Sequence, residues 1–194
     1  YLTIIFEATG SVLKYPLEIR ELEPKPELQE VYENDAVTVA AFPLSHQIPC
    51  LGFRITEKPK KPKFLFYKAM EAGIPKEYFH LIKQGTDVEL LNGETLLAAD
   101  YLGEPEPPLT YCYCSDTQFD PAVADYARGA SLLYHEATFL NEHAERAAET
   151  YHSTAEQAAR IAQMAGAGRL LLGHFSARYF QLDQHLREAR QMAE

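Results

Sequence analysis

The sequence pattern that best defines the fold is Leu109-Thr-Tyr-Cys-Tyr-Cys-Ser-Asp116. Its first six residues alternate as a strand does, and a polar turn follows them. Further short apolar strands are expected at 131–134 (Ser-Leu-Leu-Tyr) and 169–173 (Arg-Leu-Leu-Leu-Gly), with helical stretches between them. This strand–helix–strand–helix–strand order predicts an α/β fold whose parallel sheet has right-handed crossovers.

Helices in this half of the chain have recognisable ends. Asp120-Pro121 predicts an N-cap followed by proline at the first helical position. Ser153-Thr-Ala-Glu156 has the spacing of a capping box, and Gly166 favours a helix end. The expected helices are 121–128, 141–150, 154–166 and an amphipathic 182–193.

Upstream, residues 1–9 are typical of the last turns of a helix that stops near Gly10. Because no cap precedes this helix, we expect that preceding residues are missing. Residues 58–108 are rich in proline and lysine and are expected to form an arm inserted into one incomplete domain, 1–194. Strands are expected at 16–23, 28–33, 36–42 and 50–57, and the arm should hold a helix at 64–72 and a turn at 91–94.

Composition narrows the class of protein. The chain is 46% hydrophobic and 24% charged, which suits a soluble domain with a core. It has no apolar run near the roughly 18 residues that span a bilayer, and its start does not resemble a signal peptide. Three cysteines cannot form a disulfide framework. Cys112 and Cys114 share one strand face, where they either ligate a metal or are small buried side chains in a reducing compartment.

The net charge of −10 repels nucleic acid at long range, so a polyanionic substrate needs local positive charge. One segment at the base of the arm, Glu57-Lys-Pro-Lys-Lys-Pro-Lys63, supplies it. Such a run is commonly just a solvated loop. If the chain handles phosphates, however, these lysines are candidate contacts: Lys58, Lys60, Lys61 and Lys63.

Metal-binding residue types follow the three parallel strands. Asp116 follows the first strand, His135-Glu136 the second and His174 the third. Each has an ordinary structural explanation when taken singly, but parallel strands bring their carboxyl ends to one edge of the sheet. Carboxylate and imidazole together suit zinc, manganese or iron, and a carboxylate can bridge two ions. His46, which follows strand 36–42 in the same way, is a further candidate ligand.

Five motifs make the pattern specific. In order they are His46-Gln-Ile-Pro…Gly-Phe-Arg, Ser-Asp116-Thr, His135-Glu-Ala-Thr138-Phe, His152-Ser-Thr-Ala…Gln-Ala-Ala and Gly-His174-Phe-Ser-Ala-Arg178-Tyr. Together they resemble ribonuclease Z, the tRNA 3′-processing endonuclease of the metallo-β-lactamase superfamily. The resemblance spans nearly the whole chain.

The resemblance implies a metallo-β-lactamase αββα sandwich, here apparently lacking its N-terminal portion, and two zinc ions. His46 would bind the first ion, Asp116 would bridge both, and His174 would bind the second. His152 and Glu136 would form a supporting pair, with His152 as the proton donor to the leaving group. From the residues alone, the alternative for His152 is simply the residue before a helix cap.

Two further residues, Ser176 and Arg178, would contact the scissile phosphate by the same resemblance. An arginine suits bidentate phosphate binding, and the alternative for Arg178 is a solvent-facing loop residue. The expected activity is removal of 3′ trailers from precursor tRNA by attack of a metal hydroxide on the phosphodiester. The resemblance further implies a cytoplasmic homodimer with no membrane association.

Two departures from the family pattern bear on this expectation. None of the seven histidines lies in a His-x-His-x-Asp-His motif, so the chain alone is expected to be inactive. The arm carries Gly73-Ile-Pro75 in place of a Pro-Pro-Gly-Pro-like turn, which puts tRNA binding by the arm in doubt. The lysine run at its base is the candidate substitute. The alternatives are another phosphodiesterase of the superfamily and a non-catalytic scaffold.

Overall fold

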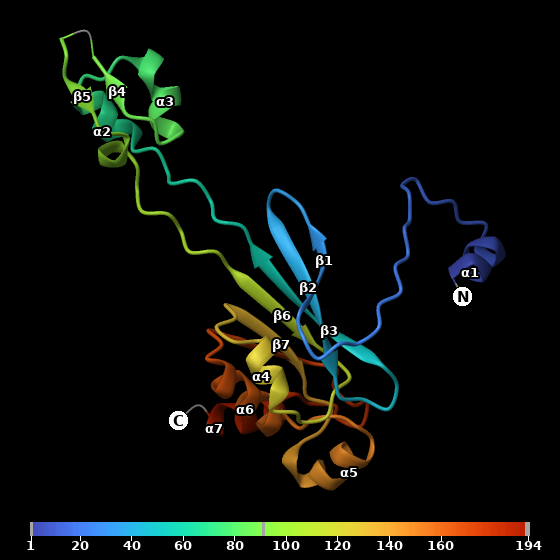
Figure 1. The fold of residues 1–194 in the computed structure, drawn as a ribbon. Helices are drawn as coiled ribbons and strands as arrows, with labels where there is room; N and C mark the ends of the chain where they lie inside the picture. Colours follow the sequence, from blue (N-terminus) through green and yellow to red (C-terminus); the bar gives the residue numbers. More distant parts are fainter. Residues whose placement is uncertain (1, 91, 193–194) are drawn as a thin grey trace.

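The computed structural model describes residues 2–90 and 92–192, and its largest element is one six-stranded sheet (Figure 1). Its strands, in spatial order, are β1 (Gln29–Glu33), β2 (Val37–Leu44), β3 (Cys50–Glu57), β6 (Thr110–Cys114), β7 (Leu132–Glu136) and β8 (Leu170–Gly173). Strands β1, β2, β3 and β6 pair antiparallel. Strands β6, β7 and β8 pair parallel, which confirms the predicted order.

Helices cover one face of this sheet (Figure 1). Cys112, Cys114 and Leu133 point to that face without solvent exposure and pack against Val123 and Ile161. Burial raises the pKa of the Cys114 thiol, so this residue behaves as a small apolar core side chain. The helices of this layer are α4 (Ala122–Tyr126), α6 (Ala155–Ala165) and α7 (Asp183–Gln191), while α5 (Ala144–Glu149) follows the short η3 (Asn141–His143).

The opposite face of the sheet is aromatic. Register places Phe53 beside Tyr113 and Ile55 beside Tyr111, each alternating with residues that face the helices. Tyr113 stacks on Tyr134 with 4.7 Å between ring centroids, and 38% of Tyr113 remains exposed.

The arm projects from the sheet on two extended segments (Figure 1) and has an apolar core of its own. Ile74, Phe79, Ile82 and Val88 are buried in that core. Its elements are α2 (Phe66–Glu71), η1 (Lys76–Tyr78), α3 (Phe79–Lys83), β4 (Val88–Glu89), β5 (Thr95–Leu96) and η2 (Ala98–Tyr101). The predicted helix at 64–72 is therefore shorter, and of the turn predicted at 91–94, Leu91 lies outside the described residues.

The first predicted strand is wrong. Helix α1 (Leu2–Thr9) ends at Gly10, as expected, but residues 10–28 contain no helix or strand. Tyr15, Leu17 and Ile19 alternate as strand residues do, yet all are exposed. A strand needs a neighbour to accept its backbone hydrogen bonds, and this segment pairs with none of the described strands.

The helix boundaries also differ from expectation. Helix α6 is capped by Thr154, whose hydroxyl accepts from Gln157 N (3.2 Å) while Gln157 Oε1 accepts from Thr154 N (2.9 Å). Ser153, the predicted cap, instead donates its hydroxyl to the carbonyl of Thr117 at 2.7 Å. The predicted helix 121–128 shortens to α4, and 141–150 divides into η3 and α5. None of the helices in the described ranges has the length and apolar character needed to cross a bilayer.

One histidine in the sheet is expected to make the free energy of unfolding depend on pH. His135 in β7 is fully buried, its Nδ1 donates to the carbonyl of Glu136 (2.8 Å), and its Nε2 has no partner. Burial lowers the pKa of His135, so below about pH 6.5 the unfolded chain binds a proton that the folded chain resists. The free energy of unfolding should therefore fall as pH drops, by up to about 1.4 kcal/mol per pH unit for this residue.

We expect His135→Leu to reduce that slope, measured by urea unfolding between pH 7 and pH 5. His80→Gln, at an exposed position on the arm, is the matched control and should keep the wild-type slope. An unchanged slope in His135→Leu would show that this imidazole is not the source of the pH dependence.

Candidate metal centre

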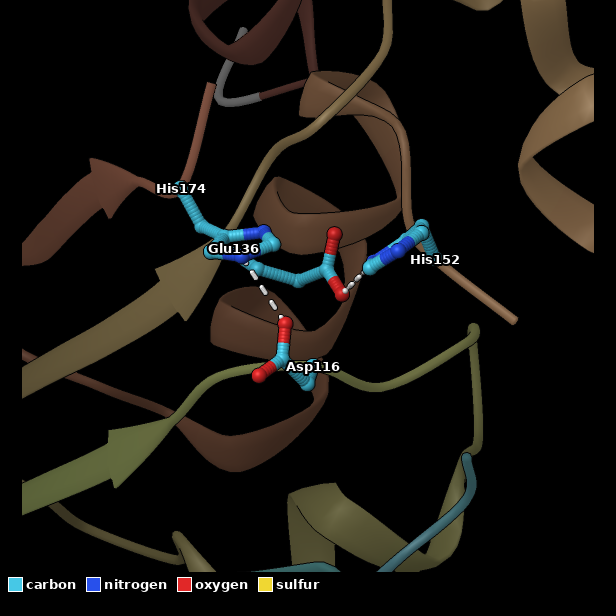
Figure 2. A group of neighbouring side chains, drawn as sticks. All are labelled: Asp116, Glu136, His152 and His174. Atoms are coloured by element: carbon cyan, nitrogen blue, oxygen red, sulfur yellow. Dashed lines mark hydrogen bonds and ion pairs between the residues drawn. The ribbon is translucent and has the colours of Figure 1, made fainter. Parts of the chain in front are cut away.

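Three parallel strands end at one edge of the sheet, and the side chains that follow them meet there (Figure 2). Asp116 lies two residues after β6, Glu136 is the last residue of β7, and His174 directly follows β8. His152 joins them from the segment before α6. One ligand atom from each of these four residues lies within 4.8 Å of the others.

Asp116 and His174 form the open half of the cluster. Oδ1 of Asp116 is 2.9 Å from Nε2 of His174, and both side chains are about two-fifths exposed, at 42% and 41%. The pair can therefore be reached from solvent.

Glu136 forms the closed half. Its side chain has no exposure, and its carboxylate accepts hydrogen bonds from four neighbouring residues. Oε1 accepts from Thr117 N (2.7 Å) and His152 Nδ1 (2.8 Å), while Oε2 accepts from the Thr138 hydroxyl (2.6 Å) and Ser153 N (3.1 Å). A buried carboxylate needs such donors because leaving it unpaired is costly.

His152 is therefore held in one ring orientation. Its Nδ1–H donates to Glu136, and 18% of the side chain is exposed. The other ring nitrogen, Nε2, is left for a proton or a metal ion. His152 therefore does more than precede the helix cap, because its ring is paired with Glu136 inside the cluster.

His46 lies beside the cluster but outside the group of four. Its ring centroid is 5.2 Å from that of His152, which in turn is 5.3 Å from that of His174. The Nδ1 of His46 donates to the carbonyl of Tyr151 at 3.0 Å, which leaves Nε2 unbonded.

The backbone at this edge is strained. Asp116 (φ 55°), Tyr151 (φ 57°) and His174 (φ 56°) are the non-glycine residues with positive φ in the described ranges. Such conformations cost roughly 1–3 kcal/mol each and gather at functional sites. Here two of the three carry the Asp116–His174 pair, and the third accepts the hydrogen bond of His46.

Ser176 and Arg178 lie in the loop after His174. The Nε of Arg178 donates to the Ser176 hydroxyl (3.2 Å), and the guanidinium lies 5.0 Å from the ring centroid of Phe139. Arg178 is exposed but braced by these two contacts. This combination favours a positioned group over a freely solvated loop residue.

The lysines at the base of the arm are mostly paired with carboxylates. Lys58 lies 2.6 Å from Glu33 and Lys60 3.0 Å from Glu57, and Lys63 is paired with Glu106. Among the described residues, Lys61 makes no ion pair. The segment thus presents less free positive charge than its sequence suggests.

The motifs pointed to some residues incorrectly and passed over others. His135, grouped with Glu136 at the strand end, is buried on the helix-facing side of the sheet and lies outside the cluster. Thr117, Thr138 and Ser153 hold Glu136, a role that the sequence did not predict for any of them. All three residues stand in the quoted motifs, Thr117 after Asp116, Thr138 two residues after Glu136 and Ser153 after His152, and that is the signal available in the sequence.

The open pair fits a transition-metal ion. Imidazole nitrogen and carboxylate oxygen are ligands that zinc accepts. Two ligands bound at about 2.0–2.1 Å to one tetrahedral zinc lie roughly 3.3 Å apart, close to the 2.9 Å between these atoms.

Comparison with known proteins agrees with the fold and the motifs. Residues 102–175 match the family model of the Beta-lactamase superfamily domain. The chain is 38% identical over 190 residues to Ribonuclease Z of Porphyromonas gingivalis, covering 98% of this chain and 62% of that protein. It is 40% identical over 182 residues to Ribonuclease Z of Bacteroides fragilis, covering 91% and 58%.

Among solved structures, the metallo-β-lactamase fold protein YhfI from Bacillus subtilis superposes with a TM-score of 0.54 at 20% identity, over 87% of this chain and 47% of that one. The chain spans about 60% of the length of the curated relatives that it matches. It therefore has the metallo-β-lactamase fold and resembles ribonuclease Z over nearly all of its 194 residues.

Proposed function

We propose that these residues form part of a zinc-dependent endoribonuclease that removes 3′ trailers from precursor tRNA. The observation that carries the proposal is the side-by-side placement of two pairs, Asp116–His174 and Glu136–His152, at the ends of parallel strands. The similarity to ribonuclease Z supports the choice of substrate.

His46, Asp116 and His174 would hold the metal, with Asp116 between two zinc ions. When bound, zinc supplies Lewis acidity and activates water near neutral pH. Because two of these side chains stand open to solvent, ion and substrate can both reach them.

His152 would act on the leaving group. Glu136 holds Nδ1–H, so a protonated ring presents its second proton on Nε2 toward the open side of the site. That proton would pass to the leaving oxygen of the phosphodiester as the bond to phosphorus breaks. Arg178, braced on Phe139 and Ser176, would bind the phosphate oxygens through its guanidinium.

The chain covers 62% and 58% of these relatives, so the activity is proposed for a protein of their full length. The 194 residues contain no His-x-His-x-Asp-His motif, and we infer that alone they do not cleave precursor tRNA. A cytoplasmic location and a homodimer, both expected from the resemblance, are further parts of the proposal.

The role of His152 is separable from metal binding. In the full-length protein that contains these residues, His152→Ala should slow single-turnover cleavage of a tRNA with a 3′ trailer by about 10²–10⁴-fold. Zinc content, measured by atomic absorption, should stay at the wild-type level because the proposed ligands are His46, Asp116 and His174, and Nε2 of His152 is proposed to carry a proton. His80→Ala on the exposed surface of the arm is the control for both measurements.

Loss of zinc in His152→Ala would instead make its Nε2 a ligand, which the four-residue cluster allows geometrically. Asp116→Asn is the comparison for loss of a proposed ligand, because it keeps the side-chain shape while removing the proposed bridging charge. It should lose both zinc and activity. Cleavage of bis-nitrophenyl phosphate but not of the tRNA would favour a different phosphodiesterase, and inactivity of the zinc-loaded protein on both would favour a scaffold.

Variants of the lysine run at residues 57–63 test whether this segment binds tRNA. Lys61 is exposed and makes no described ion pair, so Lys61→Ala should weaken tRNA binding more than Lys63→Ala, whose partner is Glu106. If Lys61 contacts one phosphate, the slope of log affinity against log salt should fall by about 0.7–0.9. Lys14→Ala, in the segment before the sheet, is the control, and equal effects in all three variants would argue against a specific contact.

A further inference from the structure

The loop that carries Arg178 is hydrogen-bonded at both of its ends to one neighbouring segment. At the first end, Ser176 N donates to the carbonyl of Thr138 at 3.1 Å. At the second end, the Tyr179 hydroxyl accepts from Leu140 N, also at 3.1 Å. The exposed side chain of Arg178 belongs to the stretch between these two bonds, so its backbone cannot move independently of that segment.

The same segment also fixes the place of His152. Phe139 N donates to the carbonyl of Ser153 at 3.2 Å, and Ala155 N donates to the carbonyl of Phe139 at 3.0 Å. The Phe139 side chain is buried, and its ring centroid lies 6.3 Å from that of His152. The guanidinium of Arg178 lies 5.0 Å from the centroid of the same Phe139 ring. One buried ring therefore neighbours both the proposed proton donor and the proposed phosphate-binding group.

Tyr179 makes the one of these two loop bonds that a side-chain substitution can remove, because the bond at the other end joins backbone atoms. Its ring meets that of His185 in α7 edge to face, with 4.7 Å between centroids, and its hydroxyl oxygen is 3.3 Å from Nδ1 of His143. Among the described residues, the buried Leu140 N has no other acceptor. Loss of the hydroxyl would leave this donor without a partner, which is unfavourable enough to displace the end of the loop.

We propose that Tyr179 is a positioning residue for Arg178. It holds the guanidinium on the Phe139 ring and so fixes the distance between that group and His152. Tyr179 acts through Arg178 and does not itself touch the substrate. The role in phosphate binding rests on the proposed function, whereas the placement of Arg178 can be measured without metal or tRNA.

The variants separate the hydroxyl of Tyr179 from its ring. Tyr179→Phe keeps the ring that packs on His185 and removes only the hydroxyl. Tyr32→Phe is the matched control, because the Tyr32 hydroxyl also accepts a hydrogen bond, from Asn34 Nδ2 at 3.1 Å. Tyr32 lies in β1, at the opposite edge of the sheet from β8. Arg187, an exposed arginine of α7 that makes none of the described ion pairs, is the reference for an unrestrained guanidinium.

The first measurement is the ¹⁵N order parameter of the Arg178 Nε–H bond in the metal-free, full-length protein. In the wild type and in Tyr32→Phe, this order parameter should be higher than that of Arg187, because Nε donates to Ser176 and the guanidinium packs on Phe139. In Tyr179→Phe it should fall toward the Arg187 value. The same order parameter in Tyr179→Phe and the wild type would overturn the proposal.

The second measurement is a double-mutant cycle on cleavage of a tRNA with a 3′ trailer by the zinc-loaded, full-length protein. Arg178→Ala should lower kcat/KM by about 10–100-fold, as expected for loss of a hydrogen bond to a charged group, and Tyr179→Phe should lower it by about 3–10-fold. In the Arg178→Ala background, Tyr179→Phe should have no further effect, because no guanidinium is left to position. Losses that multiply would show that Tyr179 only supports the fold, and would overturn the proposal.

The two measurements distinguish failure of the Tyr179 role from failure of the proposed function. A lower Arg178 order parameter in Tyr179→Phe, in a protein that cleaves no tRNA when loaded with zinc, would support the role of Tyr179 and count against the proposed function. Normal tRNA cleavage by Tyr179→Phe, with an unchanged order parameter, would do the reverse.

Discussion

The buried carboxylate of Glu136 is the constraint on which the rest of the site depends. It sits at the end of β7 and collects hydrogen bonds from the segment after β6, through Thr117, and from the segment before α6, through His152 and Ser153. Removing these donors would leave a charge buried without partners, which is strongly unfavourable. The strand ends are therefore fixed relative to one another before any ligand binds.

From this fixed point the cluster opens toward solvent in order. The side chain of Glu136 is fully buried, that of His152 is mostly buried, and those of Asp116 and His174 are about two-fifths exposed to solvent. A proton-handling pair at the closed end keeps its geometry because water cannot compete for its hydrogen bonds. A pair at the open end can exchange what it holds. One sheet edge thus offers two environments a few ångströms apart.

Much of this arrangement could be predicted from the sequence, and the rest depends on contacts between distant segments. The parallel order of three strands follows from local periodicity, and with it the meeting of Asp116 and His174. The strand predicted at 16–23 is absent although its residues alternate as strand residues do. It has no neighbouring strand to pair with, and a local sequence pattern cannot reveal whether such a neighbour exists. The helix cap is Thr154 and not the predicted Ser153, because the Ser153 hydroxyl donates its hydrogen bond to the carbonyl of Thr117. Thr138 was passed over because its contacts with both Glu136 and His174 are visible only in three dimensions.

The left-handed backbone at Asp116, Tyr151 and His174 affects how mutational scans of this protein are read. Asparagine and aspartate tolerate that conformation, while β-branched residues strongly disfavour it. A full substitution profile at Asp116 or His174 therefore mixes two quantities, the ability to bind a cation and the ability to turn the chain. Tyr151 is not a proposed ligand, and it contacts His46 through its carbonyl and through a T-shaped ring contact with 6.5 Å between centroids, so its profile reports chiefly the second quantity. Its profile is the internal baseline against which the other two positions can be interpreted.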